Sequence, residues 1–73
     1  MRLITMKGCI PCKMVKQYLE ENNIQGVDIL NVEDNEEIVE QYNIKQTPSM
    51  ILDDGTVLAG KDNIIDYFDE EGE

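Results

Sequence analysis

Histidine is absent from this sequence, and cysteine occurs only twice among its 73 residues, as Cys9 and Cys12. Zinc normally needs four nitrogen or sulfur ligands, and iron–sulfur clusters are held by several cysteine thiolates. The missing histidines and the missing second cysteine pair therefore disfavour a metal site. A small secreted domain normally carries several structural disulfides, so a single close pair instead indicates working thiols in a reducing compartment.

Long apolar runs and basic residues are also scarce. No apolar run approaches the roughly 20 residues of a membrane span, and the first residues do not have the pattern of a secretory leader. The sequence contains six basic and sixteen acidic residues, which gives a net charge of −10. This charge disfavours nucleic acid and anionic membranes as partners. We expect a cytoplasmic, monomeric protein with one domain over residues 1–73.

The few basic residues are unevenly distributed along the chain. Residues 1–19 contain four of them and no acid, whereas residues 20–73 contain the other two and all sixteen acids. The cysteine pair therefore lies in the only basic segment of the sequence.

The spacing of apolar residues predicts secondary structure in the order β-α-β-α-β-β-α. Strands are expected at residues 2–6, 27–32, 50–52 and 56–59, and helices at about 11–22, 34–43 and from 62 onward. Asp34 and Glu37 resemble a capping box, Asp62 a cap of the last helix, and Asp53-Asp54-Gly55 a hairpin turn. Residues 69–73 are expected to form an acidic tail. The helix positions assigned to the core are Met14, Val15, Tyr18, Ile38, Val39, Tyr42, Ile64, Ile65 and Phe68.

The stretch from Lys7 to Lys13, K-G-C-I-P-C-K, lies where the first strand gives way to the first helix. Side chains three positions apart on a helical turn have Cβ atoms about 5–6 Å apart, so the two cysteines could form a disulfide with little backbone movement. Because the loop it closes is so short, this disulfide would stabilise the fold only weakly. Reversible redox exchange is the better interpretation.

The position of each cysteine suggests its role. Cys9 would lie at the mouth of the helix, where free N–H groups and the helix dipole favour a thiolate, and Lys7 and Lys13 would add to this effect. Cys12 would lie one turn further in and be more shielded. We therefore predict that Cys9 is the attacking cysteine and Cys12 the resolving one.

Over essentially its whole length the chain resembles a glutaredoxin or a very small thioredoxin. The resemblance rests on C-I-P-C at the strand-to-helix junction, Thr47-Pro48 before the third strand, and Gly60-Lys61-Asp62 before the last helix. It implies a minimal α/β thioredoxin fold with a four-stranded mixed sheet flanked by helices. The implied strand order is 2-1-3-4, with the first and third helices on one face and the second on the other.

The resemblance also implies where a substrate would bind. Pro48 would be cis and face the disulfide, and the backbone of Thr47 would pair with an extended substrate segment. Pro11 and Lys13 would support the cysteine pair. On the implied fold the remaining substrate-binding candidates lie at the rim of the site: Lys7, Lys45, Gly60 and Lys61.

The implied activity is thiol–disulfide exchange, reducing protein disulfides or glutathione mixed disulfides, with ribonucleotide reductase as a family-typical electron acceptor. No tightly bound cofactor is expected. Either glutathione, as a co-substrate, or a flavoprotein disulfide reductase would supply electrons, and Ala59-Gly60 stands where glutaredoxins usually have Gly-Gly. The alternative is a non-catalytic adaptor or a metal-binding module that keeps the same fold.

Overall fold

The computed structural model describes residues 1–71 of the chain. Its elements follow the predicted order β-α-β-α-β-β-α, with one additional short 3-10 helix, η1, before the second helix. Their bounds are β1 Arg2–Thr5, α1 Ile10–Glu21, β2 Asp28–Asn31, η1 Val32–Asp34, α2 Glu36–Gln41, β3 Ser49–Ile51, β4 Val57–Ala59 and α3 Lys61–Glu71.

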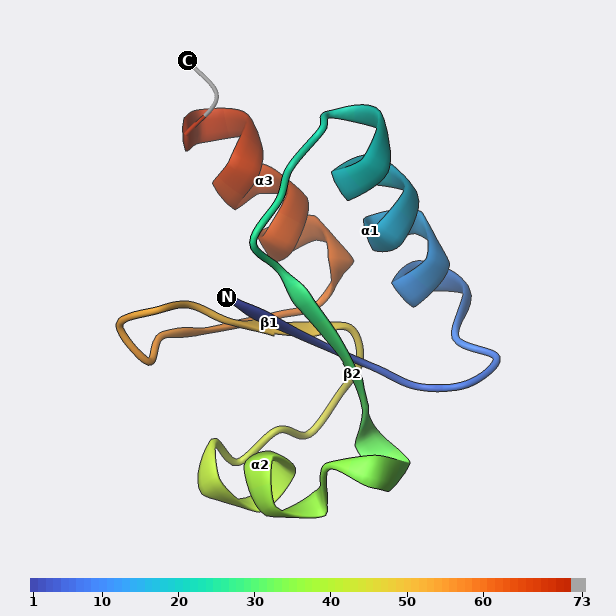
Figure 1. Cartoon of the computed structure of the whole chain (residues 1–73), viewed down its shortest axis with the longest axis vertical. Helices are drawn as coiled ribbons and strands as arrows, with labels where there is room; N and C mark the ends of the chain where they lie inside the picture. The colour runs from blue at the N-terminus through green and yellow to red at the C-terminus, as the bar shows by residue number, and fades with distance from the viewer. Residues whose placement is uncertain (72–73) are drawn as a thin grey trace.

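The four strands form one mixed sheet in the order β2-β1-β3-β4. β1 runs parallel to β2, as expected for strands joined by a crossover helix, and antiparallel to β3, while β3 and β4 form a hairpin. Helices α1 and α3 lie on one side of the sheet and α2 lies on the other (Figure 1). The α/β thioredoxin fold implied by the resemblance is therefore confirmed, including its strand order.

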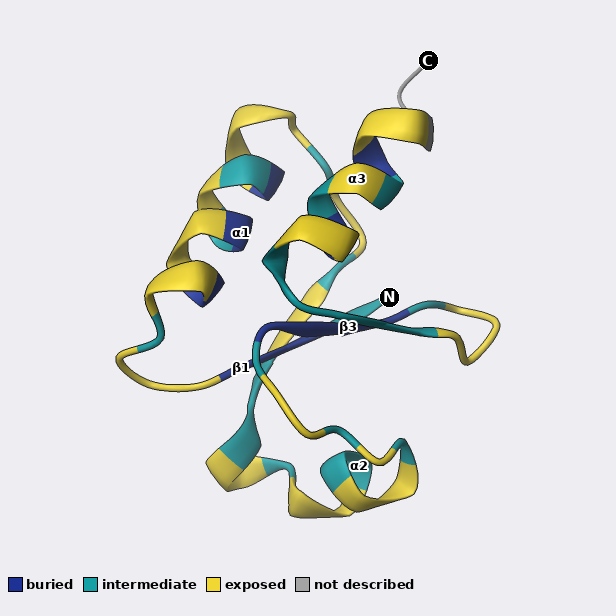
Figure 2. Cartoon of the chain, turned by 180° about the vertical axis from the view of Figure 1, so that it is seen from behind, coloured by how far each residue is buried: buried dark blue, intermediate teal, exposed yellow. Residues whose placement is uncertain are grey.

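The main core lies between the sheet and the α1–α3 pair. Leu3 of β1 and Met50 of β3 are partners across the sheet and are fully buried there. Because side chains alternate along a strand, Ile4 and Ile51 are buried on the opposite face, toward α2. Figure 2 shows the buried residues of α1 and α3 on their inner sides. The other members of the main core are Val15, Leu19, Ile64 and Phe68.

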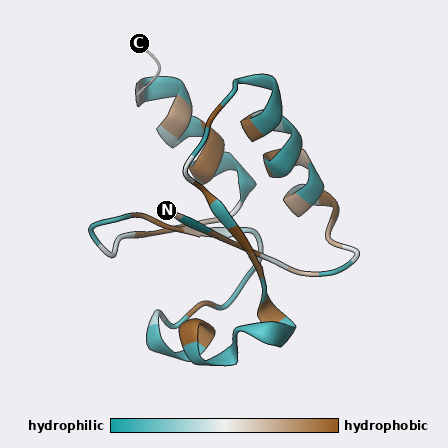
Figure 3. Ribbon diagram, in the orientation of Figure 1, coloured by the Kyte–Doolittle hydropathy of each residue, from teal (hydrophilic) through white to brown (hydrophobic). Residues whose placement is uncertain are grey.

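The prediction that Met14 belongs to the core is wrong, because its side chain is 46% exposed. The buried stripe of α1 instead runs through Cys12, Val15 and Leu19, and Met14 lies on its flank. The outer surfaces of α1 and α3 are largely hydrophilic, as Figure 3 shows. The remaining predicted core positions are all buried or half-buried.

Two predicted helix caps are also wrong. Asp34 ends η1, and α2 begins only at Glu36, after Asn35. The cause is Asn31, whose side chain accepts the backbone N–H of Glu33 at 2.8 Å and starts a helical turn earlier than predicted.

Asp62 lies inside the first turn of α3, which begins at Lys61. The carbonyl of Gly60 accepts the N–H of Ile64 at 3.2 Å, so the helix starts one residue before the predicted cap. The helix then continues through Glu71, so the first part of the predicted acidic tail is helical. Residues 72 and 73 lie outside the described part of the chain.

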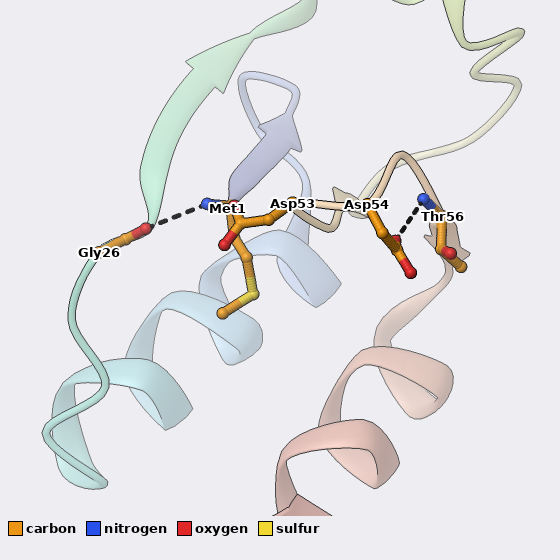
Figure 4. Close-up of polar contacts among 5 residues, drawn as sticks. All are labelled: Met1, Gly26, Asp53, Asp54 and Thr56. Carbon is orange, nitrogen blue, oxygen red and sulfur yellow. Dashed lines mark hydrogen bonds and ion pairs between the residues drawn. The ribbon is translucent and has the colours of Figure 1, made fainter.

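Polar contacts organise the end of the sheet opposite the cysteines (Figure 4). In the hairpin turn, the carboxylate of Asp54 accepts the backbone N–H of Thr56 at 2.9 Å, which lowers the pKa of Asp54. The amino group of Met1 donates to Asp53 at 2.8 Å and to the carbonyl of Gly26 at 3.2 Å. The start of β1 is thereby connected to both neighbouring loops. No helix within residues 1–71 has the length and apolar character needed to cross a membrane.

Candidate active site

Cys9 and Cys12 form a disulfide at the start of α1, with their Cα atoms 5.2 Å apart. Cys9 is the N-cap residue of the helix, and its sulfur accepts the backbone N–H of Cys12 at 3.2 Å. Pro11 lies in the first turn, where a helix needs no backbone donor and where the fixed φ of proline suits the geometry. The sequence thus places the sulfur of Cys9 where free N–H groups converge.

The two cysteines differ sharply in burial. Cys12 is 1% exposed, whereas Cys9 is half-buried. Ile10, between them in the sequence, is 68% exposed. Cys9 is therefore the more accessible of the two cysteines, and the attacking and resolving roles stay a prediction.

The turn before the cysteines depends on Gly8. This residue has a φ of +78°, a value that L side chains rarely adopt, although a Cβ atom there would meet only open space. The N–H of Cys9 donates a hydrogen bond to the carbonyl of Met6 at 3.2 Å, which closes the turn. Backbone conformation, and not crowding, therefore sets the requirement for glycine directly before the disulfide.

Thr47 and Pro48 face the disulfide from the loop before β3, although 38 positions separate Thr47 from Cys9. The hydroxyl of Thr47 donates to the sulfur of Cys9 at 3.7 Å, and the Thr47 carbonyl oxygen lies 3.9 Å from the same sulfur. Pro48 is buried, and its peptide bond with Thr47 is cis, as the resemblance implied. The backbone and hydroxyl of Thr47 therefore lie beside the sulfur of Cys9.

Gly60, directly before α3, is hydrogen-bonded to the Thr47-Pro48 loop: its N–H donates to the carbonyl of Pro48 at 2.9 Å. Its φ of +91° again suits glycine. A pocket of about 330 Å³ opens here and brings together the predicted substrate-binding residues Thr47, Pro48, Gly60 and Lys61. Its other lining residues are Pro11, Gln46, Ala59, Asp62 and Asn63.

The lysines singled out from the sequence, Lys7, Lys13, Lys45 and Lys61, line three different pockets, and one of these pockets contains the cysteines. Lys7 and Lys13 line a pocket of about 280 Å³ together with both cysteines. Lys45 lines one of about 290 Å³ beside Thr47, and Lys61 lines the pocket at Pro48. The ammonium of Lys61 lies 3.7 Å from the carboxylate of Asp62, which offsets part of its charge.

Sequence reasoning missed several residues that line these pockets. Lys16 and Asn31 share the pocket that contains both cysteines. Lys16 could have been found, because it lies four positions after Cys12 and so on the same face of α1. Asn31 ends β2 beside the end of the parallel strand β1, which also places it near the cysteine loop. Gln46 lines the two pockets beside Thr47, and neither its residue type nor its spacing predicts this position.

Metal-ligating residues do not gather elsewhere in the described part of the chain. Within residues 1–70, no group of three or more histidine, cysteine, aspartate or glutamate side chains is arranged to hold a metal ion.

Comparison with known proteins agrees with this geometry. The sequence matches the family model of the thioredoxin domain over residues 3–66. The chain belongs to the thioredoxin family. Its structure is also similar to the crystal structure of the thioredoxin-like protein BC3987, with a TM-score of 0.76, 26% sequence identity and 94% of each chain covered. No curated protein matches the sequence. The thioredoxin fold and the close cysteine pair support a thiol–disulfide redox function.

Proposed function

We propose that this member of the thioredoxin family is a thiol–disulfide oxidoreductase that reduces disulfides in proteins or in glutathione adducts. The observation that carries the proposal is the asymmetry of the disulfide. The accessible sulfur of Cys9 lies at a helix N-terminus beside Thr47, and the sulfur of Cys12 is buried behind it. Such an arrangement suits one thiol that attacks and one that resolves.

The reaction follows from these two positions. The Cys9 thiolate attacks one sulfur of the substrate disulfide, so a Cys9–substrate disulfide forms and the first substrate thiolate leaves and takes a proton from water. Cys12 then loses its proton and attacks Cys9, which forms the Cys9–Cys12 bond and releases the second substrate thiol. Two electrons pass from the protein dithiol to the substrate, and no tightly bound cofactor takes part.

The surroundings of Cys9 suggest how a substrate is held. An extended segment would pair with the backbone of Thr47, and its flanking residues would occupy the pocket lined by Pro48 and Gly60. Lys7, Lys45 and Lys61 would attract anionic groups such as the carboxylates of glutathione.

Two electron donors are compatible with this site, glutathione as a co-substrate and a flavoprotein disulfide reductase. Ribonucleotide reductase is an acceptor that the resemblance to glutaredoxins and thioredoxins suggests. These assignments extend the proposed chemistry and leave the roles of Cys9 and Cys12 unchanged.

Reduction of insulin by dithiothreitol tests the proposal. The protein should accelerate the reduction, and Cys9→Ser should abolish the acceleration. Cys12→Ser should retain the first attack and accumulate a mixed disulfide, so its trapped partners can be identified by mass spectrometry. If the wild-type protein gives no acceleration at any concentration while it still binds partners, the adaptor alternative replaces this proposal.

A further inference from the structure

The pocket that contains both cysteines has a distinctive charge. Its lining includes the three cations Lys7, Lys13 and Lys16 and no acidic residue. Lys16 is half-buried, whereas Lys7 and Lys13 are exposed. Lys16 lies one helical turn after Cys12 and therefore on the same face of α1, and it is the half-buried lysine of this pocket.

Cys12 must lose a proton before it can attack, although burial penalises the thiolate. A buried carboxylate could act as a base, but none is available: the buried polar side chains among residues 1–70 are Thr5 and Ser49. Thr5 lines the same pocket, but its hydroxyl already donates to the carbonyl of Leu30 at 3.3 Å. The charged groups placed to stabilise a Cys12 thiolate are therefore the lysines that line this pocket.

The charged groups on neighbouring elements do not provide this stabilisation. Lys61 and Asp62, at the start of α3, line the pocket at Pro48 and lie close to each other. Glu33 and Asp34 of η1 line a separate pocket with α2. Lys45, before β3, lines the pocket beside Thr47. The charged residues of the pocket that contains Cys12 are therefore Lys13 and Lys16 of α1 and Lys7 of the turn before it.

We infer that Lys16 is a positioning residue for the resolving step, in which its ammonium stabilises the thiolate of Cys12. This inference rests on the proposed function. In the mixed disulfide, Cys12 gives its proton to water and attacks the sulfur of Cys9, the Cys9–Cys12 bond forms, and the bond from Cys9 to the substrate sulfur breaks. The departing thiolate takes a proton from water, and Lys16 keeps its own proton throughout.

Stopped-flow reaction of the reduced protein with 4,4′-dithiodipyridine tests the inference. The first thiopyridone released reports attack by Cys9, and the second reports resolution by Cys12 as an intramolecular, concentration-independent phase. The reagent is neutral, so loss of a cation should not change its encounter rate. The variants are Lys16→Gln, Lys16→Arg and, as a control that lowers the net charge equally at an exposed loop position, Gln25→Glu.

The expected result is a change in the pH profile of the second phase. In Lys16→Gln its midpoint should rise by about 1 pH unit. A less acidic thiol is also a better nucleophile, with a Brønsted coefficient of about 0.4–0.5, so resolution should be about three- to fourfold slower below the midpoint and about threefold faster above it. Lys16→Arg should restore the wild-type profile, and Gln25→Glu should not change it.

The outcomes separate the two proposals. If the wild-type protein releases only one thiopyridone, Cys12 does not resolve and the proposed function is wrong. If both phases occur but Lys16→Gln leaves the profile unchanged, or slows resolution equally at every pH, the role of Lys16 is wrong and the proposed function stands.

Discussion

Alkylation of the reduced protein should distinguish the two cysteines by pH. The experiment follows the rate of reaction with iodoacetamide over a pH series, with Cys12→Ser reporting on Cys9 alone and Cys9→Ser reporting on Cys12 alone. We expect Cys9 to become reactive well below the free-thiol value of about 8.5. We expect Cys12 to react slowly throughout, because it is 1% exposed.

The size of the effect on Cys9 can be worked from its contacts. A hydrogen bond from the backbone N–H of Cys12, at 3.2 Å, to a charged sulfur contributes about 1.5–3 kcal/mol. The helix N-terminus contributes about 0.3–1 kcal/mol more, and the first turn of α1 contains no acid that would oppose it. At about 1.4 kcal/mol per pH unit, and with the lower values appropriate to a half-exposed sulfur, the midpoint should fall by about 1 to 2 units.

Two results would refute this reasoning. If the midpoint for Cys9 lies at or above about 8.5, the helix N-terminus and the Cys12 N–H do not stabilise its thiolate. If Cys12 reacts as fast as Cys9 or faster, the assignment of attacking and resolving cysteines must be reversed.

Three further predictions concern charge, a helix–helix contact and the core. Reduction of an anionic disulfide by the protein should slow as the salt concentration rises, and it should slow further in Lys45→Glu. The rate at which neutral dithiothreitol reacts with the protein should stay unchanged. Equal losses in both reactions would refute the role of Lys45. Tyr18 donates to Asp69 at 2.6 Å, which raises the pKa of Tyr18 above its usual value near 10. The stability from this bond should therefore be complete below pH 10 and be lost as pH rises through the raised pKa, and urea unfolding of Tyr18→Phe should lack this loss. Leu19→Ala should lower the free energy of unfolding by about 2–5 kcal/mol and Met14→Ala by no more than about 0.5 kcal/mol. Similar losses for the two variants in urea unfolding would contradict the exposed fractions of 5% for Leu19 and 46% for Met14.

The order of elements could be predicted from the sequence because each strand and helix carries a clear apolar period and is bounded by glycine, proline or polar turns. The face of a helix that is buried was harder to predict. In α1, Cys12 takes the core position that the apolar pattern assigned to Met14. Hydrophobicity alone does not reveal this, because the direction in which a helix faces is set by the elements that pack against it.

The starts of α2 and α3 were misplaced by one or two residues because the capping residues were assigned wrongly. Any of several polar residues near Asn31 and Asp34 could cap a helix, and the choice depends on where β2 ends. The cysteine pair and the Thr47-Pro48 loop were predicted correctly as neighbours only through the resemblance to a known fold. The contact between Cys9 and Thr47 joins residues 38 positions apart, and no local sequence pattern predicts it.

The edges of the sheet have a consequence for how the protein meets other chains. An edge strand presents unpaired N–H and C=O groups that can recruit a foreign strand and begin aggregation. Here the edge strands β2 and β4 contain only four and three residues. The exposed Asp28 precedes the exposed Ile29 on β2, and a turn with two aspartates leads into β4. Short, acid-flanked edges discourage strand addition at β2 and β4. Under the proposed function, an extended substrate would therefore pair with the Thr47 loop and not with either edge of the sheet.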